Sequence, residues 1–389
     1  MLTAAPITDN ASTLANEVRY LQQLIRFRSV TPDEAGAIGW LSEQLEQRGF
    51  CCHRFTIAGV TNLIAKIEFG SGPSVAFCGH IDVVPAVASR WQCDPFAGDI
   101  IAGEIIGRGA ADMKGGVAAM LEATDRLLAD TPSKGTFYWL ITSDEEGEAE
   151  YGSALIADYL EQHGVVLDAC IVGEPTSEQK VGDTIKNGRR GALSAKLQVS
   201  GKAGHVAYPE HTINAAHLGA QIAMALQEIV WHKDIEGSKT SLQVTGLHVP
   251  NSLDNLVPAQ CQINFNVRYS HGYMSRDIQL QIGEALSRWH EHINISWERP
   301  CEPYYTAGNK DFDFITLVEG AIFQCTHSYP KLSTSGGTSD GRFFANAHTQ
   351  VIECGVRNHT IHQDNERVPV NDLLKITDIY TATLRKVFA

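Results

Sequence analysis

Carboxylate and imidazole side chains occur at several places where an apolar run of this sequence ends. The most acidic place is the stretch LITSDEEGEAE at 140–150, in which Glu145 and Glu146 follow an apolar segment. Like charges this close raise one another's pKa unless a cation offsets them. The stretch is therefore either a solvated acidic turn or part of a metal site, and the rest of the sequence has to distinguish the two.

His80 and Asp82, in FCGHIDVVP, lie two residues apart at the end of a predicted strand, so their side chains share a face. A metal-bound imidazole commonly donates its second N–H to a carboxylate, and this pair supplies both groups. Taken alone, a loop histidine beside a helix-capping aspartate is an equally good interpretation.

Three further residues, Asp112, Glu174 and His362, are each only weak evidence for a metal site when taken alone. Asp112 begins a predicted helix at 112–130, where a simple N-terminal cap is the commoner role. Glu174 follows an apolar strand and His362 lies in the polar loop 357–370, and either could be an ordinary loop residue. The glycines around Asp112 lack the GxGxxG spacing of a dinucleotide site, so we do not predict phosphate binding there.

Together these residues predict a pair of metal ions. Two divalent ions that share a carboxylate need a mixture of imidazole and carboxylate, which Zn²⁺ accepts, whereas an all-oxygen set suits Mg²⁺ or Ca²⁺. Paired ions polarise a carbonyl and lower the pKa of bound water, and a nearby carboxylate that is not a ligand acts as general base. Spacing alone does not decide whether Glu145 or Glu146 is that base.

The elements that must position these residues are short apolar strands and amphipathic helices. Strands that alternate with helices predict an α/β sheet that is at least partly parallel. The predicted strands are 61–69, 74–82, 136–143 and 168–175, and the predicted helices are 11–27, 33–50 and 112–130.

The pattern changes near Gly191 to a β-α-β-β-α-β order, which is typical of ferredoxin-like domains. Its predicted strands are 192–201, 241–249, 261–270 and 294–300, and its predicted helices are 213–232 and 275–292. The first pattern returns with a strand at 350–356 and a helix at 371–388. We therefore predict one domain formed by 1–190 and 305–389, interrupted by a small α+β domain at 191–304.

Composition excludes several classes of partner. The 389 residues are enough for two domains, and the net charge of −14 argues against nucleic acid or an anionic membrane as the main partner. No apolar run approaches the roughly 18–20 residues that cross a bilayer. The first twenty residues lack a signal-peptide pattern, and the nine cysteines lack metal-finger spacing, so we expect reduced thiols in a cytoplasmic protein.

The motifs GHIDVVP, GRGAADMKGG, TSDEEG, VGEPTS and IHQDNE occur in this order and resemble the M20 family of dinuclear zinc peptidases and deacylases. The resemblance covers nearly the whole chain, including the place of the insertion. It implies a zinc-peptidase-like catalytic domain with a mixed, largely parallel sheet and an inserted α+β ferredoxin-like lid domain through which two copies form a homodimer. It also implies two Zn²⁺ per subunit, with Co²⁺ as an alternative ion.

The same resemblance implies a role for each candidate residue. The metal ligands it implies are His80 and Glu174 on one ion, Asp112 between the ions, and Glu146 and His362 on the other. Glu145 matches the general base, and Asp82 matches the residue that orients His80.

Within the family, segments 186–209 and 333–344 are most similar to the branch that hydrolyses N-succinyl-LL-2,6-diaminopimelate to succinate and LL-2,6-diaminopimelate in lysine biosynthesis. His205 matches a residue that reaches the neighbouring subunit's active site and stabilises the oxyanion. The substrate-binding residues implied by the match are Arg189, Arg268, Asn255, Gly337 and Thr338. The arginines suit this substrate because they pair with carboxylates.

Two other functions fit parts of the pattern. A relative that removes the acyl group of N-acetylornithine or of another N-acyl amino acid would use the same metal ligands and base. A non-catalytic scaffold stabilised by metal would use the ligands but would have no need of Glu145, so we favour the hydrolase.

Overall fold

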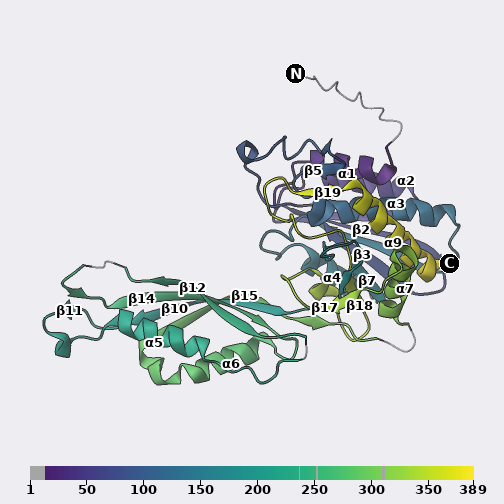
Figure 1. The fold of residues 1–389 in the computed structure, drawn as a ribbon. Helices are drawn as coiled ribbons and strands as arrows, with labels where there is room; N and C mark the ends of the chain where they lie inside the picture. Colours follow the sequence, from purple (N-terminus) through teal and green to yellow (C-terminus); the bar gives the residue numbers. More distant parts are fainter. Residues whose placement is uncertain (1–13, 236, 251–252, 309–311) are drawn as a thin grey trace, which may run out of the picture. The chain divides into compact units, whose positions relative to one another are not determined.

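The computed structural model describes residues 14–235, 237–250, 253–308 and 312–389 (Figure 1). The chain forms two compact units. The first consists of Met1–Asn187, Thr306–Ser333 and Ser339–Ala389, and the second of Gly188–Tyr305 and Thr334–Thr338. The predicted domain boundaries at 191 and 304 stay a prediction, because a compact unit is not by itself a domain that folds alone.

The first unit is built on an eight-stranded mixed sheet in the order β1-β2-β6-β3-β7-β18-β8-β17. Its strands are β1 (Cys51–Ile57), β2 (Val60–Gly70), β3 (Ser74–His80), β6 (Gly135–Thr142), β7 (Ala169–Val172), β8 (Thr184–Lys186), β17 (Lys331–Ser333) and β18 (Gln350–Glu353). The four central strands β6, β3, β7 and β18 run parallel. Because these strands are apolar on both faces, they lie in the core, as the predicted runs of apolar residues require.

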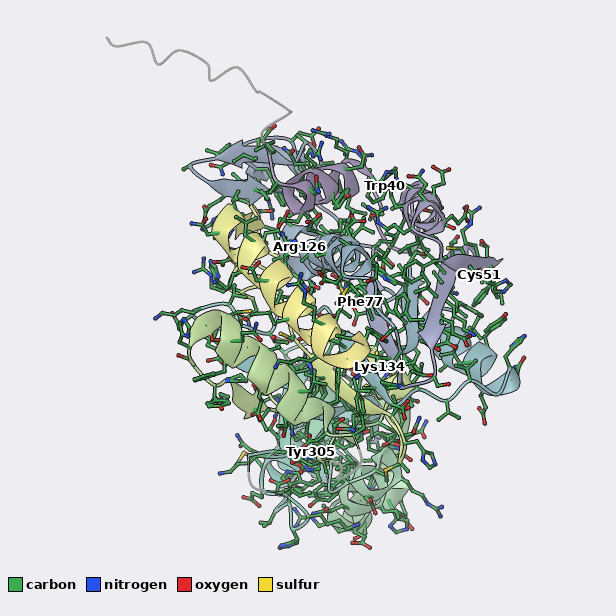
Figure 2. The ribbon with its side chains drawn as sticks, turned by 90° about the vertical axis from the view of Figure 1, so that its right-hand side faces the viewer. Trp40, Cys51, Phe77, Arg126, Lys134 and Tyr305 are labelled. Atoms are coloured by element: carbon green, nitrogen blue, oxygen red, sulfur yellow. The ribbon has the colours of Figure 1, made fainter. Side chains whose placement is uncertain are left out.

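Helices cover the sheet of the first unit. They are α1 (Asn16–Arg26), α2 (Ala37–Gln47), α3 (Gly115–Ala129), α4 (Ser153–Gln162), α7 (Phe314–Thr326), α8 (Gly341–Phe344) and α9 (Val370–Phe388). Helix α9 lies between α3 and α7 and contacts both, as Figures 1 and 2 show. Phe77, which Figure 2 labels, is fully buried. Its ring packs on Trp139 of β6 and Tyr380 of α9.

A three-stranded sheet in the order β19-β5-β4 completes the first unit. Its strands are β4 (Asp99–Ile101), β5 (Glu104–Ile106) and β19 (Arg367–Pro369). The pairing of β19 with β5 places the chain around residue 366 beside the segment that leads to Asp112.

The second unit has a four-stranded antiparallel sheet in the order β12-β14-β10-β15. Its elements in chain order are β10 (Gly191–Ser200), α5 (Ala215–Gln227), β12 (Ser241–His248), β14 (Gln260–Tyr269), α6 (Ser275–Ala285) and β15 (Ile293–Cys301). The first strand therefore lies between the third and the fourth, which is the ferredoxin-like arrangement. Two-stranded pairs are added by β9 (Gly188–Arg189) with β16 (Tyr304–Tyr305) and by β11 (Gly204–His205) with β13 (Leu256–Val257).

The predicted class, a mixed and largely parallel α/β sheet with an α+β unit, is confirmed. Residues 11–13 of the first predicted helix lie outside the described residues. The predicted helix at 112–130 begins only at Gly115, because Asp112 has an extended backbone (φ −120°, ψ 97°). Strand β1 and helices α4 and α7 were not predicted, and β1 gave a weak signal because most of its residues are exposed.

None of the described helices is long and apolar enough to span a membrane.

Candidate metal centre

The parallel strands β6, β3 and β7 end side by side at one edge of the large sheet. His80 is the last residue of β3, Glu174 follows β7 by two residues, and Glu145 and Glu146 follow β6. In open α/β sheets, ligands commonly bind at this carboxyl edge. The strand order thus brings together acids and an imidazole that lie far apart in the sequence.

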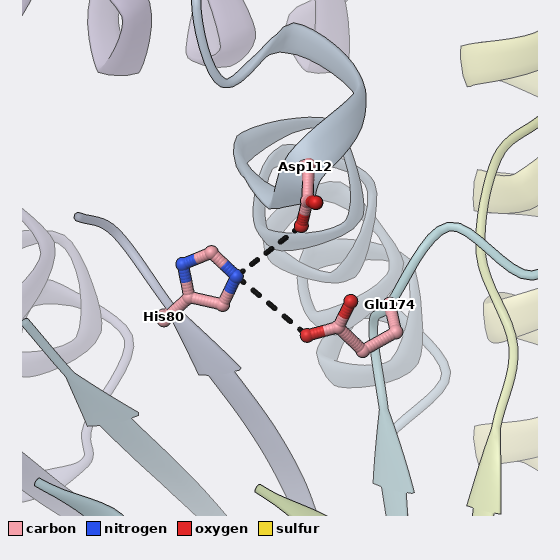
Figure 3. Close-up of side chains that lie close together, drawn as sticks. All are labelled: His80, Asp112 and Glu174. Atoms are coloured by element: carbon pink, nitrogen blue, oxygen red, sulfur yellow. Dashed lines mark ion pairs between the residues drawn. The ribbon is translucent and has the colours of Figure 1, made fainter. Parts of the chain in front are cut away.

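The first cluster is formed by His80, Asp112 and Glu174 (Figure 3). The Nε2 atom of His80 lies 3.3 Å from Oδ1 of Asp112 and 3.6 Å from Oε1 of Glu174. All three residues are buried. Both carboxylates thus face the same ring nitrogen, and these three groups could serve as ligands of one cation.

The tautomer of His80 is set from the other side of its ring. Nδ1 lies 2.9 Å from the backbone carbonyl oxygen of Asp82, and a carbonyl can only accept, so Nδ1 carries a proton. In the neutral ring the lone pair is then on Nε2, which is buried and has no hydrogen-bond partner among the described residues. An unpartnered buried nitrogen that faces two carboxylates fits a metal ligand.

The second cluster is formed by Asp112, Glu146 and His362. The Nε2 atom of His362 lies 3.0 Å from Oε1 of Glu146 and 3.4 Å from Oδ2 of Asp112. Asp112 therefore directs Oδ1 toward the first cluster and Oδ2 toward the second. One carboxylate shared in this way is what a pair of ions with a bridging ligand requires.

Glu145 lies beside these clusters and belongs to neither of them. Its Oε2 atom is 4.0 Å from Nε2 of His80, and its side chain is 17% exposed. Burial and the negative charge of Glu174 raise the pKa of Glu145 well above its usual range. Glu145 and Glu146 are adjacent in the sequence but differ in place, because Glu146 is one of the candidate ligands and Glu145 lies beside the ligands.

The pKa values in the centre show how strongly its charges interact. Hydrogen bonding to Asp112 and Glu146 raises the pKa of His362 to about 10. Burial and the charge of Asp112 raise the pKa of Glu174 to about 7. For Asp112 itself, burial favours the neutral acid, but the two imidazoles outweigh it and hold the pKa well below its usual value. A divalent cation would supply the same compensation as the protonated imidazoles.

Asp82 also positions the acidic loop. Its carboxylate accepts the amide N–H groups of Glu145 (3.3 Å) and Glu146 (3.1 Å), and its Oδ1 lies 3.6 Å from Nδ1 of His80. Asp144, the next acid along, accepts the amides of residues 149, 150 and 151. Two buried carboxylates therefore hold the turn that carries the candidate base and ligand.

A close backbone contact sets the distance between Asp112 and Glu174. A Cβ atom on Gly116 would lie 2.4 Å from the carbonyl oxygen of Gly173, which real side chains do not tolerate. Glycine at 116 thus lets the start of α3 approach the end of β7. The glycine-rich sequence around Asp112 was the only sequence signal of this contact.

Two buried acids near the centre were not predicted from the sequence. Asp340 accepts a hydrogen bond from Oγ of Ser153 (2.6 Å), and burial raises its pKa to about 6. Glu366 lies in the loop after His362, where the sequence is only loosely similar to the family motif, and it accepts the amides of Gly109, Ala111 and Asp112. Neither acid follows a strand, so the signal that identified the other acids is absent.

The remaining candidates lie in the second unit. Nη1 of Arg189 lies 3.3 Å from the carbonyl oxygen of Ser335 and 3.4 Å from that of Gly337, and Thr338 ends the same segment. Arg268 is a β14 residue paired with Ala192 of β10. His205 in β11 is exposed, and the carbonyl of Asn255 accepts the amide of Val206 (3.2 Å). Their predicted contacts with substrate stay predictions.

Comparison with known proteins identifies the class. Residues 76–386 match the model of peptidase family M20/M25/M40. The chain belongs to this family, which confirms the prediction made from the motifs.

Related proteins are similar over almost their full length. The chain is 44% identical to succinyl-diaminopimelate desuccinylase 2 of Shewanella loihica, over 95% of this chain and 99% of that protein. It is 45% identical to succinyl-diaminopimelate desuccinylase 1 of Alteromonas mediterranea, over 98% of this chain and 97% of that protein.

Solved structures share the fold at lower sequence identity. An M20 family metallo-carboxypeptidase from Sulfolobus solfataricus has a TM-score of 0.77 and 18% identity, covering 96% of this chain and 99% of that one. A dinuclear metal-binding M20 peptidase from Bacillus subtilis has a TM-score of 0.69 and 16% identity, covering 95% of this chain and 97% of that one. These likenesses confirm the fold class.

Proposed function

We propose that this chain is a metal-dependent amide hydrolase that converts N-succinyl-LL-2,6-diaminopimelate and water to succinate and LL-2,6-diaminopimelate. The observation that carries the proposal is the pair of triads that share Asp112, with Glu145 beside them, in a chain 44–45% identical to two proteins named succinyl-diaminopimelate desuccinylase. The predicted reaction class and the predicted substrate agree with those names.

The ions we propose are two Zn²⁺ per subunit, with Co²⁺ as an alternative. His80 and Glu174 would hold the first ion, Glu146 and His362 the second, and Asp112 both. The mixture of imidazole and carboxylate ligands fits zinc. When bound, such a pair of ions polarises the amide carbonyl and lowers the pKa of water.

The chain's own residues then move the proton. We propose that Glu145 takes a proton from the attacking water on its carboxylate and passes it to the nitrogen of the leaving amine. Its raised pKa suits both steps, because a carboxylate with its usual pKa would be a weak acid-base catalyst near neutral pH. Asp82 fixes the backbone of Glu145 and the ring of His80 during this exchange.

The second unit supplies substrate contacts in this proposal. Guanidinium groups bind carboxylates, and the substrate carries several, so Arg189 and Arg268 are the proposed anchors. The polar groups of Asn255, Gly337 and Thr338 would complete the substrate contacts. His205 would act across a homodimer, in the partner's site, by donating a hydrogen bond to the oxyanion.

We also propose that the reaction takes place in the cytoplasm. All nine cysteines are free thiols, which is the state that a reducing compartment maintains.

A two-substrate assay with metal analysis tests the proposal. The purified protein is loaded with Zn²⁺, its metal content is measured, and kcat/KM is determined for N-succinyl-LL-2,6-diaminopimelate and for N-acetylornithine. We expect about two ions per chain and a clear preference for the succinyl substrate. A preference for N-acetylornithine would assign the chain to the alternative deacylase, and hydrolysis that survives complete removal of metal would refute the mechanism.

A further inference from the structure

Glu366 is a fully buried carboxylate that contacts the backbone immediately before Asp112. Its Oε1 atom accepts the amide N–H groups of Ala111 (2.9 Å) and Asp112 (3.0 Å). Its Oε2 atom accepts the amide of Gly109 (3.0 Å). One side chain therefore satisfies three N–H groups of the segment that carries the shared carboxylate, which keeps this segment out of a regular helix.

Arg108 connects Glu366 to the opposite side of the centre. Its Nη1 atom donates to Oε2 of Glu366 (2.8 Å) and to the carbonyl oxygen of Gln363 (3.2 Å), the residue after His362. The guanidinium is buried and lies over the ring of Trp91 at 5.2 Å. The guanidinium of Arg108 thus bonds both to Glu366, which holds Asp112, and to the loop that carries His362.

Backbone hydrogen bonds fix the chain on either side of Glu366. The amide of Gly107 donates to the carbonyl of Glu366 (2.9 Å), and Arg367 pairs with Ile106 across β19 and β5. Oγ1 of Thr360 donates to the carbonyl of Arg367 (3.0 Å) and accepts its amide (3.2 Å), which closes the loop around His362. The position of Glu366 is therefore set independently of any ion.

We propose that Glu366 and Arg108 are positioning residues of the metal centre, which hold Asp112 and His362 at the separation that two ions sharing Asp112 require. The inference rests on the metal centre of the proposed function, but it does not depend on which amide is hydrolysed. Partners that orient metal ligands typically contribute about 10–100-fold to metal affinity.

The test compares Glu366→Gln with a matched control, Glu17→Gln. Glutamine keeps the size of residue 366 but turns an N–H group toward amides that need an acceptor. Glu17 is equally buried and also pairs with an arginine, since Nη2 of Arg126 lies 3.0 Å from its Oε1, but none of its hydrogen bonds involves a candidate ligand. The control therefore removes the charge of an equally buried glutamate that pairs with an arginine away from the centre.

The readouts are Zn²⁺ affinity, from competition with a chromophoric chelator, and the visible absorption spectrum of the Co²⁺-loaded protein. We expect Glu366→Gln to bind Zn²⁺ about 10–100-fold more weakly and to shift the Co²⁺ bands, because the ligand geometry changes. Glu17→Gln should keep the wild-type affinity and spectrum, even where its thermal stability falls.

Unchanged Zn²⁺ affinity and an unchanged Co²⁺ spectrum in Glu366→Gln would overturn the inference. An equal loss of Zn²⁺ affinity in Glu366→Gln and Glu17→Gln would also overturn it, because that result would indicate a general loss of stability. If Glu366→Gln does not fold, Arg108→Lys replaces it, because lysine keeps the charge but lacks the planar guanidinium that bonds to both Glu366 and Gln363. Wild-type behaviour of Arg108→Lys would then refute the inference. Failure of the wild-type protein itself to bind Zn²⁺ or Co²⁺ would instead refute the metal centre.

Discussion

At the scale of single residues, Glu145 and Glu146 have the same side chain and adjacent positions but different surroundings. Glu146 lies 3.0 Å from His362, which places it among the candidate ligands, whereas Glu145 lies 4.0 Å from His80 and outside both triads. Their amides are held by the same carboxylate, that of Asp82. The division between base and ligand that we propose thus follows from the direction in which each side chain leaves one fixed turn.

Replacing Glu145 with Gln should remove proton transfer and leave the metal ligands in place. We expect kcat to fall by at least about 10²–10⁴-fold, the usual contribution of a general base, with metal content unchanged. Steady-state kinetics and metal analysis of the same preparation check this. Glu150→Gln removes an exposed charge from the same loop and should keep wild-type kcat. Near-normal turnover in Glu145→Gln would remove Glu145 from its proposed role.

At the scale of elements, the centre depends on how closely α3 approaches β7. Gly116 and Gly173 meet backbone to backbone, so the approach cannot be relaxed by moving a side chain. Strand order alone brings His80 and Glu174 together, whereas Asp112 also needs this close approach of α3 to β7.

The variant Gly116→Ala should therefore be destabilised and should bind metal less tightly. Overpacking of this kind costs about 1–3 kcal/mol, measured as the free energy of unfolding of the metal-free protein. The matched control is Gly320→Ala in α7, where a Cβ atom would meet nothing within 4 Å. In this control, alanine should raise the free energy of unfolding by about 0.5–1 kcal/mol, because alanine has a higher helix propensity than glycine. Equal stability changes in the two variants would show that the contact at Gly173 is unimportant.

The loop between β7 and β8 gives a prediction about acid stability. Asp183 accepts the amides of Glu178 (2.8 Å), Gln179 (2.7 Å) and Lys180 (2.8 Å). Burial acts to raise its pKa, but these amides outweigh burial and lower the pKa below its usual value. A lowered pKa stabilises the fold above the unfolded value, about 3.9, and this contribution is lost as the pH falls through the folded value.

Asp183→Asn should consequently be less stable than the wild type at pH 7, and the difference should shrink as the pH approaches 3. Urea midpoints measured at several pH values check this, and the other titrating groups are common to both proteins. A stability difference that stays constant over this range would mean that the Asp183 charge makes no contribution.

At the scale of the whole molecule, two compact units carry different parts of the proposed activity. The candidate metal ligands and the proposed base belong to the first unit, and His205 with the proposed substrate contacts belongs to the second. The segment Thr334–Thr338 joins the second unit although both of its neighbours in the chain belong to the first. Its contact with Arg189 gives the reason, since Nη1 lies within 3.4 Å of two of its carbonyl oxygens.

If His205 acts in the partner's site, two inactive variants should restore activity when mixed. A dimer of Glu145→Gln with His205→Ala contains one site that has both groups, because the His205→Ala chain keeps its base and receives His205 from its partner. Random exchange of subunits should then return about a quarter of the wild-type activity. Activity assays after co-refolding check this, and activity no greater than that of the separate variants would contradict a role for His205 across a dimer.

The sequence by itself determined the family, the fold class and the types of the candidate metal ligands. It did so because buried strands need apolar runs, and because ligand acids and imidazoles at the ends of those runs are visible as residue types. His80 and Glu174 follow this rule, Asp112 begins a predicted helix instead, and the structure brings the ligand atoms of all three together.

Only the tertiary structure revealed Glu366, Arg108 and the contact at Gly116, and it added the difference in position between Glu145 and Glu146 that spacing alone does not show. Glu366 binds amides that precede it by more than 250 residues, and no local pattern encodes such a partner. The close approach at Gly116 likewise depends on the packing of a helix against a strand. Residue type therefore specifies which groups can bind a metal, whereas the hydrogen bonds and packing that aim those groups exist only once distant segments have come together.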